Sequence, residues 1–240
     1  MNRTNPDDII APDDFIAPKC NEEIDILFQD EHLLLINKPS KLLSLSGKNP
    51  ANLDSVHYRI RQLFPTALMI HRLDLGTSGI MVIALNKDIS RLLNRQFSER
   101  QVTKTYTALL AGRVDQERGT IALAIAKGEF PYQKICHETG KAALTEYQLL
   151  GHEDFNFHDQ SHPVSRVLYT PHTGRTHQLR IHSQQFGHPI IGCDLYSGQA
   201  GSAFKNSEHM ADRLMLHATT LEFHHPIHGE RILGKSPCPF

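Results

Sequence analysis

The stretch His71-Arg72-Leu73-Asp74-Leu75-Gly76-Thr77-Ser78-Gly79 places one carboxylate on a glycine- and hydroxyl-rich turn. Apolar runs flank it on both sides, over residues 68–70 and 80–85. An acid at this point is poorly suited to a core and well suited to project into a cleft. On turn statistics alone, however, Asp74 could equally be a turn aspartate that accepts backbone hydrogen bonds. The residues that the rest of the chain places near this carboxylate decide between a cleft carboxylate and a turn aspartate.

Strands outnumber helices on either side of this stretch. Apolar runs and alternation predict strands over residues 24–28, 32–36, 80–85, 103–111, 120–125, 143–150, 164–170, 190–192, 214–223 and 232–233. Helical spacing predicts three helices, over 53–64, from an Asp88 cap to 97, and from a Thr176 cap to 186. The polar insert 151–163 is expected to be an exposed hairpin loop. The pattern predicts an α+β fold, a central, largely antiparallel or mixed sheet flanked by helices.

Residues 1–21 are rich in Pro and Asp and lack periodicity, which predicts a flexible or surface-draped tail. We expect residues 22–240 to form one domain, because no internal composition break separates a second one. The chain has no apolar run long enough for a membrane span, no signal-peptide pattern and no paired cysteines. These features favour a cytoplasmic protein, and nothing in them demands more than a monomer.

The charge is distributed unevenly, although the net charge is only −1. Residues 1–31 hold nine acids, whereas residues 59–113 hold nine Lys or Arg against three acids. Local patches govern binding to a polyanion, so the basic segment is a candidate RNA-binding surface. A solvated helix face explains the same spacing about as well.

Three common kinds of site are disfavoured by spacing. The sixteen histidines form no H-E-x-x-H motif, so we expect no functional metal. Ser78 lacks the G-x-S-x-G context of a strained nucleophile, and no Gly-Lys-Ser/Thr follows the glycines as in a phosphate loop. A downstream block, residues 174–182, instead supplies Arg175 and Arg180 at the start of a predicted helix. An arginine beside a carboxylate keeps it ionised and oriented, as a nucleophile requires.

The motif H-R-L-D-x-x-T-S-G over 71–79 resembles the signature of the RluA family of RNA pseudouridine synthases. Four further motifs resemble that family in the same order: Asn37-Lys38-Pro39, Lys104-Thr105-Tyr106, Gly174 to His182 and Leu216-His217-Ala218. The resemblance covers about residues 22 to 235 and is greatest to the RluA branch, which modifies 23S rRNA and the anticodon stem-loop of certain tRNAs. It implies the pseudouridine-synthase fold around a catalytic cleft.

The resemblance also implies roles for individual residues. Asp74 would attack C1′ of the target uridine or take a C2′ proton in a glycal route, and both routes stay open. Tyr106 would stack on the uracil and later assist removal of the C5 proton, while Arg180 would pair with Asp74. The substrate-binding residues would be Arg72, which fills the place of the flipped base, Leu216, which packs on that base, and the motif residue His71. Neither route requires a metal or an organic cofactor.

Two other classes of function remain alternatives at this level. One is a noncatalytic RNA-binding module that retains the fold, which the presence of Asp74, Tyr106 and Arg180 disfavours. The other is a metal-dependent hydrolase that uses the histidine-rich C-terminal half.

Overall fold

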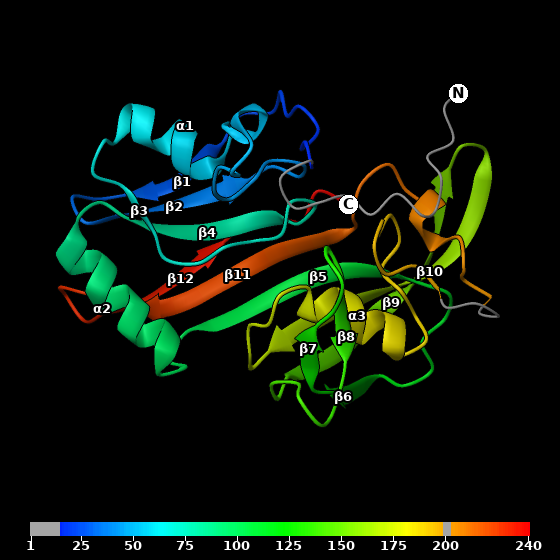
Figure 1. Ribbon diagram of the computed structural model, residues 1–240. Helices are drawn as coiled ribbons and strands as arrows, with labels where there is room; N and C mark the ends of the chain where they lie inside the picture. The colour runs from blue at the N-terminus through cyan, green and yellow to red at the C-terminus, as the bar shows by residue number, and fades with distance from the viewer. Residues whose placement is uncertain (1–14, 199–202) are drawn as a thin grey trace.

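The computed structural model describes residues 15–198 and 203–240, and this part of the chain is built on one ten-stranded sheet (Figure 1). Its main path is β1-β2-β4-β11-β5-β10-β9-β6, with β3 added to β4 and β12 added to β11. Only the β4–β11 pair is parallel, so the predicted α+β class with a mixed sheet is confirmed. The strands are β1 (Asp25–Gln29), β2 (Leu33–Lys38), β3 (Leu68–Met69), β4 (Ser78–Ala84), β5 (Thr103–Ala111), β6 (Arg118–Ala122), β9 (Leu144–Phe157), β10 (Gln160–Pro171), β11 (Leu216–His224) and β12 (Arg231–Lys235).

A separate two-stranded hairpin, β7 (Ile125–Lys127) and β8 (Gln133–Ile135), stands off the sheet beside helix α3 (Figure 1). The predicted strand 120–125 is therefore two strands, because β6 joins the main sheet and β7 leaves it. The predicted strand 190–192 was also wrong. Ile190 makes only an isolated bridge to Leu110 of β5.

The helices are α1 (Val56–Leu63), α2 (Lys87–Ser98) and α3 (Gln178–Gln185), with short 3-10 turns at Pro50–Asn52 and Ser207–His209. The predicted Asp88 cap of α2 was wrong. Asn86 caps this helix, because its extended backbone lets its side chain accept a bond from the Ile89 N–H at 3.0 Å. Asp88 lies one residue inside the helix and pairs with Arg91.

Helix α3 begins without the side-chain cap predicted at Thr176. The residue before it, His177, has a left-handed backbone with φ 55°, and no side chain caps the helix. Gln178 holds this turn instead. Its Oε1 accepts bonds from the Arg175 N–H and the Thr173 hydroxyl, and its amide donates to the Leu144 carbonyl of β9.

The insert predicted as an exposed hairpin loop over 151–163 does form a hairpin, but most of it is strand, the paired ends of β9 and β10. Its tight turn is His158-Asp159, where both residues have positive φ, as a two-residue type I′ turn requires. Phe155 and Phe157 lie two residues apart, so the period-2 pattern of a strand is present among polar neighbours. The hairpin sequence is mostly polar because one of its faces is exposed and the other is only half-buried, although Phe155 packs against the core.

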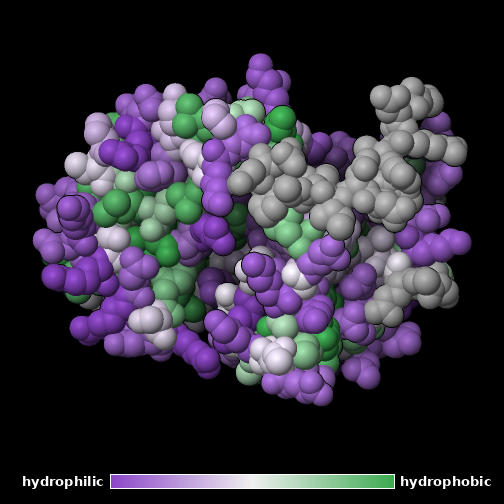
Figure 2. Space-filling model, in the orientation of Figure 1, coloured by the Kyte–Doolittle hydropathy of each residue, from purple (hydrophilic) through white to green (hydrophobic). Residues whose placement is uncertain are grey.

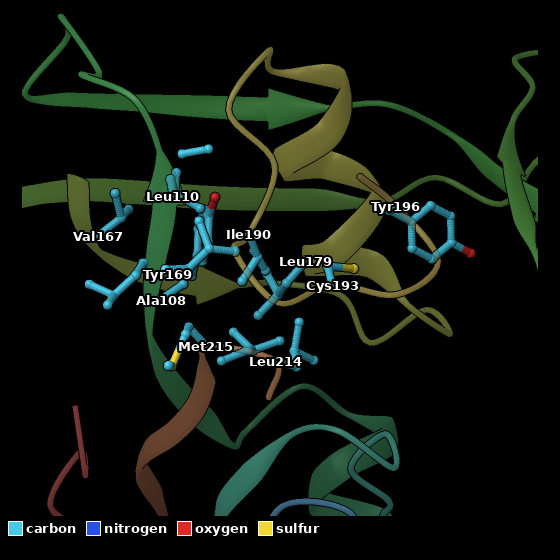
Figure 3. Packing of buried hydrophobic residues seen from close by; sticks show 14 of the residues in the cluster. Ala108, Leu110, Val167, Tyr169, Leu179, Ile190, Cys193, Tyr196, Leu214 and Met215 are labelled. Carbon is cyan, nitrogen blue, oxygen red and sulfur yellow. The ribbon is translucent and has the colours of Figure 1, made fainter. Parts of the chain in front are cut away.

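Two buried clusters fill the two halves of the sheet and meet at β11 and at Tyr106 of β5. Figure 3 shows part of one of them, with side chains from β5, β10, α3 and the segment before β11 (Ala108, Leu110, Val167, Tyr169, Leu179, Met215). The junction of the halves demands glycine at position 79. Gly79 has φ +117°, and a Cβ there would collide with the backbone of Ala218 on β11. The motif over residues 71–79 therefore ends where β4 pairs with β11.

Residues 1–14 of the predicted tail lie outside the described residues. The rest of that tail lies on the body of the protein, where Asn52 bonds to the backbone of Phe15 and Ala17. The division into a tail and one domain stays a proposal.

Candidate active site

A cleft of about 1620 Å³ lies across the junction of the two halves, and its walls include Asp74, Tyr106 and Arg180. Small-molecule sites are typically roughly 300–1,000 Å³, so this cleft has room for more than one small ligand. Figure 2 shows a hollow near the centre of this face, edged by both hydrophilic and hydrophobic residues.

The loop that carries Asp74 is held by buried donors on a neighbouring segment. Ser44 Oγ donates to the Leu73 carbonyl and accepts from the Leu73 N–H. Ser40 Oγ donates to the Gly76 carbonyl, and Lys38 Nζ donates to the Leu75 carbonyl at 3.2 Å. Burial lowers the pKa of Lys38 to about 7, while the negative charge of Asp74 acts in the opposite direction. The backbone on both sides of Asp74 is therefore fixed, which gives its side chain a defined direction.

Arg180 faces Asp74 from helix α3, as the resemblance implied, with Nη1 at 3.9 Å from Oδ2. Its shorter contacts are to other groups. Nη2 donates to Asp194 Oδ1 at 2.5 Å, and Nε donates to the Cys193 sulfur at 3.3 Å. The guanidinium is almost fully buried, and the nearby thiol and the two carboxylates raise its pKa despite that burial. A permanent positive charge therefore lies beside Asp74.

Tyr106 and Leu216 come from adjacent strands and line the same cleft. Tyr106 lies on β5 opposite Ala218 of β11, two residues beyond Leu216. Burial and the nearby charge of Asp74 both raise the pKa of Tyr106, so its hydroxyl keeps its proton at neutral pH. Leu216 is buried at the start of β11. The pair offers an aromatic face and an aliphatic side chain beside the carboxylate.

His71 and Arg72 lie next to Asp74 but differ in exposure. The His71 ring stacks on Phe97 at 5.0 Å, and its Nε2 accepts a bond from the Val82 N–H. Burial and the charge of Lys104 lower the pKa of His71 to about 3, so this ring is neutral. Arg72 is exposed at the cleft wall and has no ion-pair partner among residues 15–198 and 203–240. Its guanidinium is available to an incoming group.

Sequence reasoning missed three residues around Arg180. Asp194 and Cys193 bond to its guanidinium, and the Tyr196 ring lies 5.4 Å from it. They come from an irregular segment, where neither periodicity nor a predicted strand end marks a functional side chain.

The histidines are spread over the fold, and three of them, His182, His217 and His225, are buried and hydrogen-bonded. His225, for example, is buried, bonds to Asp30 at 2.9 Å and stacks on His228. In the described part of the chain, no three His, Cys, Asp or Glu side chains are grouped so that they could hold a metal ion. No helix there is long and apolar enough to cross a membrane.

Comparisons with known proteins point the same way as the geometry. Residues 32–185 match the family model described as RNA pseudouridylate synthase. The chain is 46% identical over 217 residues to the dual-specificity RNA pseudouridine synthase RluA of Yersinia pestis, covering 90% of this chain and 99% of that protein. The RluA protein of Escherichia coli K12 is 41% identical, with 90% of this chain and 93% of that protein covered.

A solved structure agrees with these sequences. Human RNA pseudouridylate synthase domain containing 1 is similar with a TM-score of 0.74 and 33% identity, covering 93% of this chain and 86% of that one. The resemblance drawn from the five motifs is confirmed. The chain belongs to the RluA family of RNA pseudouridine synthases, enzymes that isomerise uridine in RNA.

Proposed function

We propose that the enzyme converts a specific uridine to pseudouridine in 23S rRNA, in the anticodon stem-loop of a tRNA, or in both. The observation that carries the proposal is that Asp74 of the loop before β4, Tyr106 of β5, Arg180 of α3 and Leu216 of β11 all line one cleft. The relatives named dual-specificity synthases support two classes of RNA substrate.

In the proposed reaction, the N1–C1′ bond breaks with its electron pair passing to the uracil, the uracil rotates, and C5 bonds to C1′ as the C5 proton leaves and N1 takes up a proton. Asp74 acts at the sugar, either by attacking C1′ or by taking a C2′ proton. Arg180 faces this carboxylate with Nη1 3.9 Å from Oδ2, so its positive charge attracts the carboxylate and orients it. Tyr106 stacks on the uracil and assists removal of the C5 proton. Its raised pKa supports a role for the protonated hydroxyl before that step.

The target base has to leave its stack, which costs a few kcal/mol. Arg72 is the proposed occupant of the vacated place, because an exposed planar guanidinium can stack and hydrogen-bond there. Leu216 packs against the flipped base. His71 is the third proposed substrate-binding residue. Its bond to Val82 and its stack on Phe97 support an indirect part, holding Arg72 and Asp74 in place.

The remaining features of the proposal concern the protein as a whole. No metal or organic cofactor is required by either route at Asp74. The enzyme works as a monomer in the cytoplasm, with residues 22–240 as its catalytic domain. Sedimentation of the protein at micromolar concentration tests whether it is a monomer.

The test uses RNA that carries 5-tritiated uridine, because formation of the C5–C1′ bond expels the label. Wild-type protein should release tritium from an anticodon stem-loop, a 23S rRNA fragment, or both. Asp74→Asn keeps the shape of the side chain and removes its charge, so it should bind the same RNA and release no tritium. Comparable release by Asp74→Asn would remove the carboxylate from the mechanism. Activity that persists in chelator separates this reaction from metal-dependent hydrolysis.

A further inference from the structure

The hairpin β7–β8 forms part of the cleft wall through its tip. Phe130, Pro131 and Gln133 line the cleft, and the flanking residues Lys127 and Lys134 are exposed cations. Where the chain returns from the tip, the Gln133 N–H donates to the Tyr196 hydroxyl at 2.7 Å. The hairpin is thereby attached to the segment that follows helix α3.

The same hydroxyl makes a second hydrogen bond, to Nδ1 of His177 at 2.9 Å. Because the oxygen accepts from Gln133, its own proton is free to be donated to His177. Burial raises the pKa of Tyr196 to about 12 and lowers that of His177, so a protonated phenol faces a neutral imidazole. His177 is the residue from which α3 starts, and Arg180 follows three residues later.

The ring of Tyr196 completes the connection. It lies 5.4 Å from the Arg180 guanidinium, a distance at which a cation and an aromatic face attract. Tyr196 is almost fully buried, and Figure 3 shows its ring apart from the aliphatic side chains, with the hydroxyl turned away from Cys193 and Leu179. One side chain therefore touches the hairpin, the start of α3 and the cation opposite Asp74.

We propose that Tyr196 is a positioning residue that couples the β7–β8 hairpin to Arg180. RNA that engages the hairpin then fixes the guanidinium opposite Asp74, and binding is linked to the chemical step. This inference rests on the proposed function of the cleft. It assigns Tyr196 no contact with the reacting atoms.

Tyr196→Phe is the main test, since it keeps the ring and removes both hydrogen bonds of the hydroxyl. The single-turnover rate of tritium release at saturating RNA should fall on the order of tenfold, as expected when a catalytic group is misplaced. The Kd for RNA should change less than about twofold, since little affinity depends on the bond itself. The matched control is Tyr147→Phe, which removes a buried hydroxyl bonded to Gln116, outside the cleft, and should leave both quantities unchanged.

A second variant keeps the inference testable if Tyr196→Phe folds poorly. His177→Asn suits the left-handed backbone but is too short to reach the hydroxyl, so it breaks one bond of the pair. It should also lower the single-turnover rate. The double variant, which combines Tyr196→Phe with His177→Asn, should react no more slowly than the slower of the two single variants.

The alternatives give different results. An unchanged rate with weaker RNA binding would make Tyr196 an anchor of the hairpin only and would overturn the coupling. Additive losses in the double variant would contradict a shared path through His177. If wild-type protein releases no tritium from either RNA, the proposed substrates fail, and the fault does not lie with Tyr196.

Discussion

Arg180 lies opposite Asp74 with Nη1 3.9 Å from Oδ2, which is too far for a hydrogen bond. The Asp74 carboxylate accepts no side-chain or backbone hydrogen bond from the residues the structure describes. Arg180 is instead held by Asp194, Cys193 and the Tyr196 ring. The cation is thus fixed by groups other than its functional partner. This arrangement orients Asp74 by charge while leaving its oxygens free to approach the sugar.

Asp194→Ala should slow catalysis, because it removes the partner that holds Nη2 of Arg180 away from Asp74. The guanidinium can then bond directly to the Asp74 carboxylate, and that bond has to break before the carboxylate acts. We expect the single-turnover rate to fall on the order of tenfold.

The control for this change is Asp88→Ala. The two carboxylates are similarly exposed, 79% for Asp194 and 83% for Asp88, but Asp88 pairs with Arg91 on the outer surface of α2. Equal rates for the two variants would show that Asp194 does not position Arg180.

Arg72→Ala should impair turnover on a folded stem-loop, because no guanidinium remains to occupy the place of the flipped base. Loss of about 1.4 kcal/mol from the flipped state corresponds to a tenfold slower reaction. The rate should recover on a short single-stranded RNA, in which the uridine is already unstacked. Arg118→Ala removes an exposed arginine from β6, outside both the basic segment 59–113 and the cleft, and serves as the matched control. An equal loss on both RNAs would contradict a role in flipping.

Local motifs made part of this site predictable. Asp74, Tyr106 and Arg180 each lie in a short motif that resembles one of the RluA family, and it is this resemblance that grouped them. Asp194 and Tyr196 were not predictable, because their partners lie in other elements and their own segment is irregular. Strand patterns likewise predicted the sheet but not its details. The polar hairpin 151–163 and the Asn86 cap depend on neighbours that periodicity does not show.

Buried His217 should make stability depend on pH. Its Nδ1 bonds to the Ser78 hydroxyl, its Nε2 to Ser236, and burial together with the Arg213 cation lowers its pKa to about 4. The unfolded chain therefore takes up a proton near pH 6.5 that the folded chain takes up only near pH 4. This contribution is complete above pH 6.5 and is lost as pH falls, at about 1.4 kcal/mol per pH unit.

Urea unfolding between pH 7 and pH 4.5 measures that slope. His217→Gln should reduce the slope of unfolding free energy against pH by the amount that corresponds to about one proton, whatever its effect on stability at pH 7. The variant still contains His71, whose pKa is also lowered by burial, so its unfolding free energy should keep part of the dependence on pH. Parallel curves for the two proteins would contradict the assignment to His217.

Gly79→Ala should strongly destabilise the fold, because it forces apart the parallel β4–β11 pair. Gly79 combines a φ of +117° with a Cβ position that overlaps the Ala218 backbone, and strands on both sides prevent relief. We expect a loss of at least about 3 kcal/mol in unfolding free energy. Gly187→Ala is the matched control, because it has φ +91° and nothing within 4 Å of the added Cβ, so it measures backbone strain alone, about 1 kcal/mol. Equal losses for the two variants would mean that the close approach of β11 does not demand glycine at position 79.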